Sequence, residues 1–281
     1  MTKNNLNRLN LPAKIWIYGF LWMTAVIMLG PLFWAVLTSL KPAGEIFKAP
    51  YMVNPATLSF KGYVDVFQQA PFFIYFLNTL KITVACTLGV AITSALAGYA
   101  FARLQFPGRN VLFMIYLATM MIPRQVTLVP MFMLMKEFGL IDNHLSLILP
   151  GLFSAFGTFL LRQYFLTIPN DYDEAAKIDG CGVLRRFALI MLPFAKGTIA
   201  TLVLLTVMAV WNDFLYPMVF LNSELERTLT MGLAIFRGDA DVQWNILMAG
   251  VVISNIPILV AFLATQRFVI NGVSLSGGIK G

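Results

Sequence analysis

Long runs of apolar residues constrain this 281-residue chain more than any other feature of its sequence. Several extend for about 20 residues with few charges, the length that a helix needs to cross the hydrocarbon core of a bilayer. Only 12% of the residues are charged, about half the usual share of a soluble domain, and 59% are hydrophobic. The sequence therefore predicts an all-α integral membrane protein and argues against an unusually apolar soluble core.

Six membrane-spanning helices fit these runs best. We expect them at residues 14–37, 76–101, 110–133, 145–165, 197–221 and 244–268. The first run is too long for the core of a signal peptide and has no clear cleavage site of small residues, so it is predicted as a retained span. The expected organisation is a short N-terminal segment (1–13), one helical membrane domain (14–268) and a C-terminal tail (269–281).

Basic residues predict the orientation. If both termini are cytoplasmic, more than half of the 20 Lys and Arg residues lie on that side, as the positive-inside rule requires. They are Lys3, Arg8, Lys14, Arg103, Arg109, Arg162, Lys177, Arg185, Arg186, Lys196, Arg267 and Lys280. Lys41, Lys48 and Lys61 in the first outer loop weaken this asymmetry. The net charge of +7 is thus assigned to topology and anionic lipid headgroups, not to nucleic acid.

A charged loop at residues 166–196 separates the fourth and fifth predicted spans. Its core, residues 168–182, reads IPNDYDEAAKIDGCG. Asp171 and Glu174 have the spacing of a capping box in acidic form, which predicts that a short helix begins there after Pro169. The two glycines that follow, Gly180 and Gly182, are expected to end it in a sharp turn.

A second short helix is predicted at residues 183–192, with Asp179 as its cap. Its apolar side is formed by Leu184, Phe187 and Met191. Arg185 and Arg186 are then left for solvent, lipid or a partner. The loop is thus expected to form a helix–turn–helix outside the bilayer. It is either a docking surface or an amphipathic loop that lies on lipid headgroups.

The order Glu174-Ala175-Ala176, two residues, Asp179-Gly180, then Phe187 and Leu192-Pro193, resembles a known motif. It is similar to the EAA loop of the permeases of bacterial binding-protein-dependent, ATP-binding cassette importers. Further stretches resemble the carbohydrate-uptake branch of that family, which includes the second maltose permease subunit. They are Asn78-Thr79, RLQFPGR (103–109), LRQYF (161–165), WNDF (211–214) and GGIKG (277–281). Cys181, where the family usually has alanine, and Gly197, near a frequent proline, depart from the pattern.

The resemblance implies a six-span type I importer permease in the bacterial inner membrane, with both termini cytoplasmic. It implies several partners: a homologous second permease, usually a different chain, two ATPase subunits and an extracytoplasmic substrate-binding protein. The expected function is to form half of the pathway for a carbohydrate and to couple it to ATP hydrolysis by alternating access. A coupling helix near residues 180–187 would enter a cleft of the ATPase, where Glu174 would pair with a basic residue, and residues 273–281 would also reach that subunit. The implied coupling residues are Glu174, Ala175, Ala176, Asp179, Gly180, Cys181, Arg185 and Phe187.

ATP chemistry is assigned to the partner. The sequence has no Gly-x-x-x-x-Gly-Lys-Ser/Thr loop, so ATP and Mg²⁺ are expected to bind the ATPase subunit. The Leu275-Ser276-Gly277-Gly278 sequence matches the start of the ATPase signature only by coincidence, since no ATPase domain surrounds it. Cys86, Cys181 and the single His144 lack metal-ligand spacing. We therefore predict no catalytic residue, cofactor or metal ligand in this chain.

Polar residues within or near the apolar runs are candidates for the substrate pathway. They are Arg124, Gln125, Asn212, Asp213, Tyr216 and Asn255. Such side chains are costly in lipid, so they should face the helix bundle or a wet cavity. A structural hydrogen bond or ion pair explains Arg124, Asn212 and Asp213 equally well. Two alternative functions are an ion-coupled secondary transporter, for which Asp213 is the only acid inside a predicted span, and a scaffold that binds the ATPase without moving solute.

Overall fold

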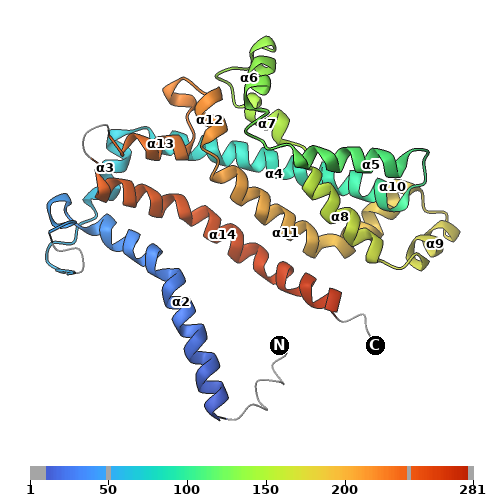
Figure 1. Ribbon diagram of the computed structural model, residues 1–281, viewed down its shortest axis with the longest axis horizontal. Coiled ribbons are helices and arrows are strands. Elements are labelled where there is room, and N and C mark those ends of the chain that lie inside the picture. The colour runs from blue at the N-terminus through green and yellow to red at the C-terminus, as the bar shows by residue number, and fades with distance from the viewer. Residues whose placement is uncertain (1–10, 49–51, 239–241, 278–281) are drawn as a thin grey trace. The chain divides into compact units, whose positions relative to one another are not determined.

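The computed structural model describes residues 11–48, 52–238 and 242–277, and every regular element in these ranges is helical (Figure 1). The prediction of an all-α protein is confirmed. The elements are α2 (Leu11–Leu40), η1 (Ala43–Glu45), α3 (Lys61–Gln69), α4 (Phe72–Arg103), α5 (Arg109–Ala118), η2 (Thr119–Met121), α6 (Leu128–Glu137), α7 (Leu145–Gly151), α8 (Ala155–Thr167), α9 (Asp171–Ile178), α10 (Val183–Arg186), η3 (Phe187–Met191), α11 (Leu192–Trp211), α12 (Leu215–Phe220), η4 (Glu224–Glu226), α13 (Leu229–Ile235) and α14 (Trp244–Gly277).

Within the described residues, five helices are long and apolar enough to cross a membrane. They are Leu11–Leu40, Phe72–Arg103, Leu145–Thr167, Val183–Trp211 and Trp244–Phe268. Four of them coincide with a predicted span within about four residues at each end. The fifth prediction, 197–221, is wrong at both ends, because the helix runs from Val183 to Trp211 and residues 215–220 form the separate α12. α14 continues through residues 269–277, which the sequence assigned to the tail. The N-terminal segment 1–10 and the last four residues lie outside the described residues.

The remaining predicted span, at residues 110–133, is not one continuous helix. α5 and η2 end at Met121, and Ile122 is extended, with φ −83° and ψ 115°. This conformation is expected before Pro123, because the proline ring clashes with a helical preceding residue. The chain becomes helical again in α6, where Pro130 lies in the first turn and removes no hydrogen bond of the helix. The six-span architecture therefore stays a prediction.

The chain divides into two compact units, one of residues 1–70 with 233–254 and one of residues 71–232 with 255–281. In the smaller unit, α3 lies very close to two backbone segments. A Cβ atom on Gly62 would lie 3.0 Å from the carbonyl oxygen of Ser39 and 3.2 Å from that of Asn245. The Ser39 hydroxyl also hydrogen-bonds the Tyr63 hydroxyl at 2.8 Å. Glycine thus brings α3 against the end of α2 and the start of α14.

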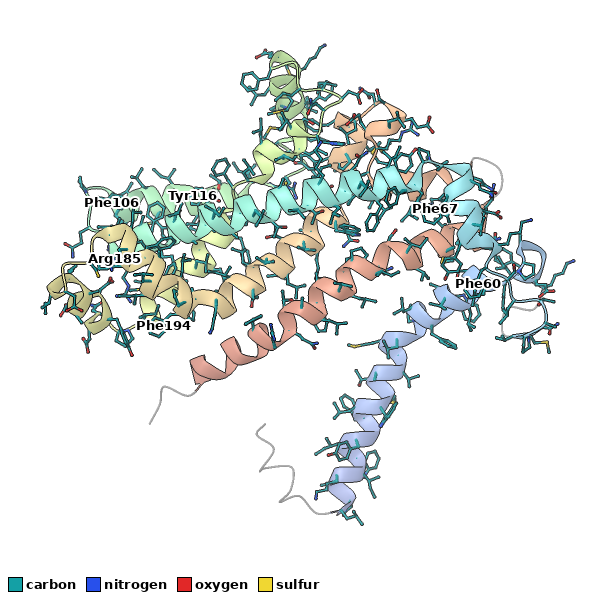
Figure 2. The ribbon with its side chains drawn as sticks, turned by 180° about the vertical axis from the view of Figure 1, so that it is seen from behind. Phe60, Phe67, Phe106, Tyr116, Arg185 and Phe194 are labelled. Atoms are coloured by element: carbon teal, nitrogen blue, oxygen red, sulfur yellow. The ribbon has the colours of Figure 1, made fainter. Side chains whose placement is uncertain are left out.

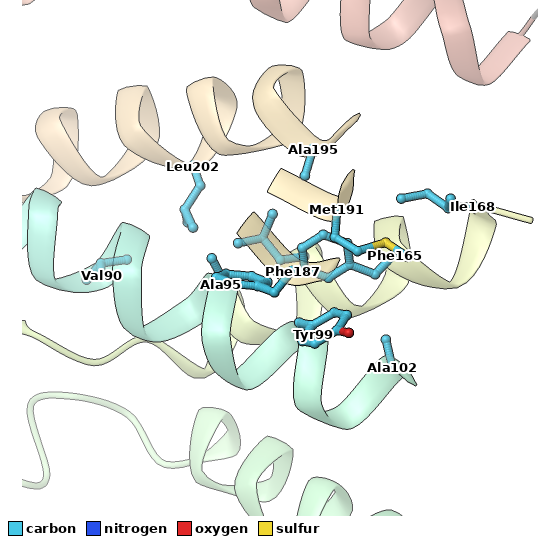
Figure 3. Close-up of a cluster of buried hydrophobic side chains, with 11 residues drawn as sticks. Val90, Ala95, Tyr99, Ala102, Phe165, Ile168, Phe187, Met191, Ala195 and Leu202 are labelled. Carbon is cyan, nitrogen blue, oxygen red and sulfur yellow. The ribbon is translucent and has the colours of Figure 1, made fainter. Parts of the chain in front are cut away.

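The core of the larger unit lies where α4, α8 and α11 pack together (Figure 3). Tyr99, Phe165, Phe187 and Met191 fill its centre, and each is at most 8% exposed. Close approach of the helices depends on small residues, as in other membrane bundles. A Cβ atom on Gly98 of α4 would lie 3.0 Å from the backbone nitrogen of Arg162 in α8.

Replacing Gly98 by leucine should separate α4 from α8. Overpacking of this kind costs about 1–3 kcal/mol. Gly30→Leu is the matched control, because no atom lies within 4 Å of a Cβ there. We expect thermal unfolding of purified Gly98→Leu in detergent at a lower temperature than wild type, with Gly30→Leu unchanged or higher. Equal melting temperatures for the two variants would contradict this packing.

At the end of α4 opposite Arg103, polar contacts hold the segment 222–229. The Asn78 side-chain amide donates to the carbonyl oxygens of Leu225 (2.7 Å) and Arg227 (3.0 Å). The Thr79 hydroxyl accepts from the Leu229 backbone N–H at 2.8 Å. The Asn78-Thr79 pair, singled out in the sequence by resemblance alone, therefore has a structural role here.

Two residues of the 139–144 turn, His144 and Asp142, bind the same segment. Buried His144 has its Nδ1 atom 3.2 Å from Lys81 Nζ and its Nε2 atom 3.1 Å from a Glu226 carboxylate oxygen. Asp142, at φ 59°, accepts from the backbone N–H groups of Asn222 and Ser223 at 2.8 Å and from the Ser223 hydroxyl. The Ser223 hydroxyl first, and then the two backbone donors, hold the pKa of Asp142 below its ordinary value.

Protonation of Asp142 should release segment 222–229. Because its folded pKa is lowered, this carboxylate stabilises the contact above its ordinary pKa, near 4, and the stabilisation is lost as the pH falls through the folded value. Hydrogen exchange at 222–229, relative to the intrinsic rate of an unprotected amide at the same pH, should therefore accelerate in acid. Asp142→Asn should raise this relative rate already at neutral pH and reduce its acid dependence to the part that comes from Glu226 and His144. Glu137→Gln, at an exposed acid on α6, should behave like wild type. Unchanged exchange in Asp142→Asn would refute the role of this carboxylate.

Candidate functional site

The predicted loop helix is present as α9, but its start differs from the prediction. Asn170, not Asp171, is the N-cap residue, and no side chain caps the helix. The predicted capping box of Asp171 and Glu174 is therefore wrong. The helix begins one residue earlier, because the Asn170 carbonyl accepts from the Asp173 and Glu174 N–H groups, and the Asn170 side-chain oxygen is occupied by the Arg103 guanidinium. Three acidic residues in the first turn still stabilise α9, because their negative charges lie at the positive end of the helix dipole.

The end of α9 follows the sequence closely. Gly180 has φ +73°, the left-handed conformation that favours glycine. Its N–H donates to the Lys177 carbonyl at 3.0 Å, and the Cys181 N–H donates to the Ala176 carbonyl at 2.9 Å. These two bonds form a Schellman motif, which satisfies the last carbonyls of the helix. Asp179 is the C-cap of α9, so the prediction that it caps the next helix is wrong.

The second loop helix is not separate from the fifth span. α10 continues through the π-helical turn η3 into α11, and residues 183–211 form one helix. The Leu192 N–H donates to the Phe187 carbonyl, five residues back. This wider turn comes directly before Pro193, which has no N–H and would clash in a regular α-helix. The prediction of an isolated helix at 183–192 is corrected accordingly.

One face of this loop is exposed, and we call it the 174–185 face. Its members are Glu174, Ala175, Ile178, Asp179, Gly180, Leu184 and Arg185. Figure 2 shows Arg185 on α10, at the end of the larger unit that also carries the Phe106 loop. Ile178 is 87% exposed and Leu184 is 74% exposed. The apolar period of the sequence predicts Leu184 on the buried side of its helix, which is wrong, and it gives no signal for the exposure of Ile178.

The other coupling residues predicted from the resemblance do not lie on this face. Ala176 and Phe187 are buried, and Cys181 is half-buried. The centroid of the Phe187 ring lies 5.2 Å from that of the Tyr99 ring of α4. Figure 3 shows the two side chains next to each other. Phe187 therefore attaches the loop to the helix bundle from within.

A buried triad of charges, Asp173, Arg103 and Arg186, lies beneath α9. The Asp173 carboxylate lies 3.7 Å from Arg103 Nε and 3.6 Å from Arg186 Nη1, and all three side chains are at most 9% exposed. Arg103 also donates to the carbonyl oxygens of Phe165 (2.7 Å) and Ile168. The triad thus joins α9 to the end of α4 and to α10. The sequence prediction that Arg186 faces solvent, lipid or a partner is wrong.

The proposed pathway residues Arg124, Asp213 and Tyr216 meet at a cavity of about 190 Å³. An Arg124 guanidinium nitrogen lies 3.8 Å from the Asp213 carboxylate, and the guanidinium carbon lies 4.6 Å from the Tyr216 ring centroid. The Tyr216 hydroxyl donates to the Arg124 carbonyl at 2.6 Å. Thr79, Ile82 and Cys86 of α4 line the same cavity. The arrangement offers a charged pair and a hydroxyl beside an apolar wall.

The other pathway candidates do not line this cavity. Gln125 is exposed, and the Asn212 side chain donates to the Met208 carbonyl of its own helix at 2.8 Å. Asn255 is half-buried in α14. No cluster of three or more His, Cys, Asp or Glu residues that could hold a metal ion occurs in the described ranges.

The model of one protein family, described as the binding-protein-dependent transport system inner membrane component, matches residues 89–274. The chain belongs to this family. The resemblance found in the loop motif is thereby confirmed. The fold agrees as well: a bacterial ABC transporter involved in the import of the acidic polysaccharide alginate has a chain with a TM-score of 0.81 and 24% identity. The match covers 92% of this chain and 98% of that one.

Relatives within the family match nearly the whole chain. The arabinooligosaccharides transport system permease protein AraQ of Bacillus subtilis is 32% identical over 265 residues, or 93% of this chain and 94% of the relative. The diacetylchitobiose uptake system permease protein NgcG of Streptomyces coelicolor is 32% identical over 262 residues, or 92% and 86%. The sn-glycerol-3-phosphate transport system permease protein UgpE of Yersinia pestis is 31% identical over 256 residues, or 88% and 91%.

Removing the Asp173 charge should loosen the loop without changing its exposed face. Asp173→Asn leaves two buried guanidinium groups without their counter-charge, a change that costs about 3 kcal/mol. We expect hydrogen exchange in residues 168–186 to accelerate. Glu174→Gln changes the next residue, which is exposed, and should leave exchange unchanged. Similar exchange in both variants would show that the triad does not hold the loop.

Proposed function

We propose that this chain is a permease subunit of an ATP-driven carbohydrate importer and docks its ATPase through the 174–185 face. The observation that supports this proposal best is the exposure of that face. Ile178 and Leu184 are apolar side chains in a charged loop, where burial against a partner would be favourable. Glu174, also exposed, supplies a charge for a basic partner residue. An amphipathic loop on lipid headgroups would explain the apolar pair less well, since the loop also presents several acids.

The triad gives this docking surface a mechanical connection to the bundle. A displacement of α9 would be transmitted to α4 through the Asp173–Arg103 ion pair. It would be transmitted to α11 through the Asp173–Arg186 ion pair and the continuous helix of residues 183–211. The same two helices supply cavity residues at their other ends, Thr79 and Ile82 from α4 and Val210 from α11. Closure of the ATPase would therefore move both walls of the cavity, as alternating access requires.

The cavity is the proposed contribution of this chain to the pathway. About 190 Å³ is smaller than the 300–1,000 Å³ of complete ligand pockets, so a second permease subunit is expected to enclose the rest. Arg124 and Asp213 pair with each other, which leaves no unpaired acid for a coupling ion at this place. That pairing disfavours the alternative of an ion-coupled secondary transporter.

The further parts of the proposal follow the family. The chain would lie in the bacterial inner membrane with both termini cytoplasmic and would work with two ATPase subunits, which bind ATP and Mg²⁺, and an extracytoplasmic binding protein. A carbohydrate substrate is supported by relatives named for arabinooligosaccharides and diacetylchitobiose. A relative of similar identity is named for sn-glycerol-3-phosphate, so related permeases belong to transport systems for different hydroxylated solutes. Residues 273–281 are proposed as a second contact with the ATPase.

ATP hydrolysis by the assembled importer in lipid vesicles tests this function. The chain would be co-expressed with the neighbouring permease and ATPase genes and assayed with the binding protein and a panel of saccharides. Glu174→Lys should reduce the saccharide-stimulated rate at least about tenfold, because a lost interfacial charge pair costs 2–5 kcal/mol. Glu137→Lys, at an exposed acid on α6, is the control and should leave the rate unchanged. Copurification without any ATPase, together with solute movement driven by an ion gradient, would disprove the proposal.

A further inference from the structure

The smaller unit contains a polar pocket that the proposed function leaves without a role. It lies between α3 and the start of α14, and we call it the α3–α14 pocket. Its volume is about 650 Å³, within the 300–1,000 Å³ typical of small-molecule sites. The polar and aromatic residues that matter here are Lys61, Asp65, Gln69, Gln243, Trp244 and Asn245. The pocket shares no residue with the cavity of Arg124 and Asp213.

Polar side chains in this pocket are available to a ligand. Among the described residues, the side chains of Lys61, Asp65, Gln69, Gln243 and Asn245 make no hydrogen bond or ion pair. Three of them are amides, each with two N–H donors and one acceptor oxygen. One ammonium and one carboxylate complete the set. Lys41 also lines the pocket, but it is buried, with its ammonium 6.0 Å from the centroid of the Trp34 ring. The five accessible groups offer donors and acceptors in similar measure, which suits hydroxyl groups better than a phosphate or a metal ion.

An aromatic surface adjoins these polar groups. The Trp244 ring meets the Phe47 ring edge to face, with centroids 6.2 Å apart and planes at 83°. Trp244 keeps 36% of its surface exposed. An indole face next to amide and carboxylate groups matches the two sides of a sugar ring, which carries C–H bonds on its faces and hydroxyls around its edge.

The pocket walls are held in place before any ligand binds. Gly62 at the start of α3 lies against the Ser39 and Asn245 carbonyl groups, so α3 and the start of α14 are fixed at close range. The Ser39–Tyr63 hydrogen bond secures α3 further. Preorganised walls lower the entropic cost of binding. In Figure 2, the labelled Phe60 and Phe67 show where α3 begins and runs.

We propose that the α3–α14 pocket binds a neutral oligosaccharide, as a site of this chain separate from the Arg124 cavity. This proposal rests on the function proposed above. The predicted topology places the pocket on the outer side of the membrane, where the binding protein releases its cargo. Trp244 contacts a ring face, and Asp65, Gln69 and Asn245 bind hydroxyls.

Protection of a cysteine from alkylation tests the site directly. Gln69→Cys places a thiol in the pocket, and Gln68→Cys places one beside it on the exposed surface of α3. Both are made in a chain whose Cys86 and Cys181 are replaced by alanine, purified as the complete importer in lipid nanodiscs. A charged maleimide is applied with arabinotriose, N,N′-diacetylchitobiose or the saccharide that stimulates ATP hydrolysis best. We expect saturable protection of Cys at 69 and none at 68.

A second substitution separates binding from nonspecific shielding. Asn245→Ala in the Gln69→Cys chain removes hydrogen bonds to the ligand and should raise the half-protecting saccharide concentration about tenfold. Labelling in the absence of saccharide serves as the folding control, and it should not change. Inorganic phosphate is the counter-probe, and it should not protect.

The outcomes separate this proposal from the proposed function. If a saccharide stimulates ATP hydrolysis but protects neither cysteine, or protects both equally, the α3–α14 pocket is not a saccharide site while the importer function stands. Protection by phosphate as strong as by any saccharide would identify an anion site and overturn the proposal. If no saccharide stimulates ATP hydrolysis, the proposed function fails whatever is found at residue 69.

Discussion

The exposed loop depends on the buried charges of Asp173, Arg103 and Arg186. α9 has only eight residues, and a helix of that length is unstable alone in water. It buries little apolar surface, since Ala176 is its only buried hydrophobic residue. Attachment of α9 to the bundle therefore rests on the triad and on the carbonyl groups that Arg103 also binds, together with the Tyr172 ring, whose centroid lies 5.0 Å from that of the Phe194 ring of α11. These contacts fix the orientation of the 174–185 face.

Local features of the loop were predictable, and long-range ones were not. The turn at Gly180 follows from glycine and from the spacing of the helix before it, which are both local. The N-terminal cap was predicted wrongly because the N-cap residue is Asn170, whose side-chain oxygen binds Arg103, far away in the sequence, and does not cap the helix. The burial of Arg186 depends in the same way on Asp173. A periodic pattern shows which side of a helix is apolar, but it does not show where a distant charge will lie.

The membrane spans also combine features that the local sequence predicts with features that it does not. Apolar length located five of them, because the bilayer sets that length whatever the tertiary contacts are. Proline had different effects at two positions. Pro123 interrupts the helix, whereas Pro193 follows a π-helical turn that keeps residues 183–211 continuous. This continuity places the loop and one wall of the cavity on the same rigid element. Among the six pathway candidates, three meet at the cavity, since polarity within a span selects candidates but does not determine their directions.

The two charged sites differ in exposure, and this difference suits their proposed tasks. All three side chains of the triad are buried, and removal of Asp173 would leave two guanidinium groups without a counter-charge, which suits a connection that holds its elements together. In the cavity, Arg124 is 71% exposed and Asp213 is 23% exposed. Such a pair contributes little stability and exchanges readily with water or with a hydroxyl of a passing solute. The proposed coupling requires a rigid connection at the loop, because motion of the ATPase has to be transmitted to the cavity. It also requires an ion pair at the cavity that opens easily, because the site must not retain the solute.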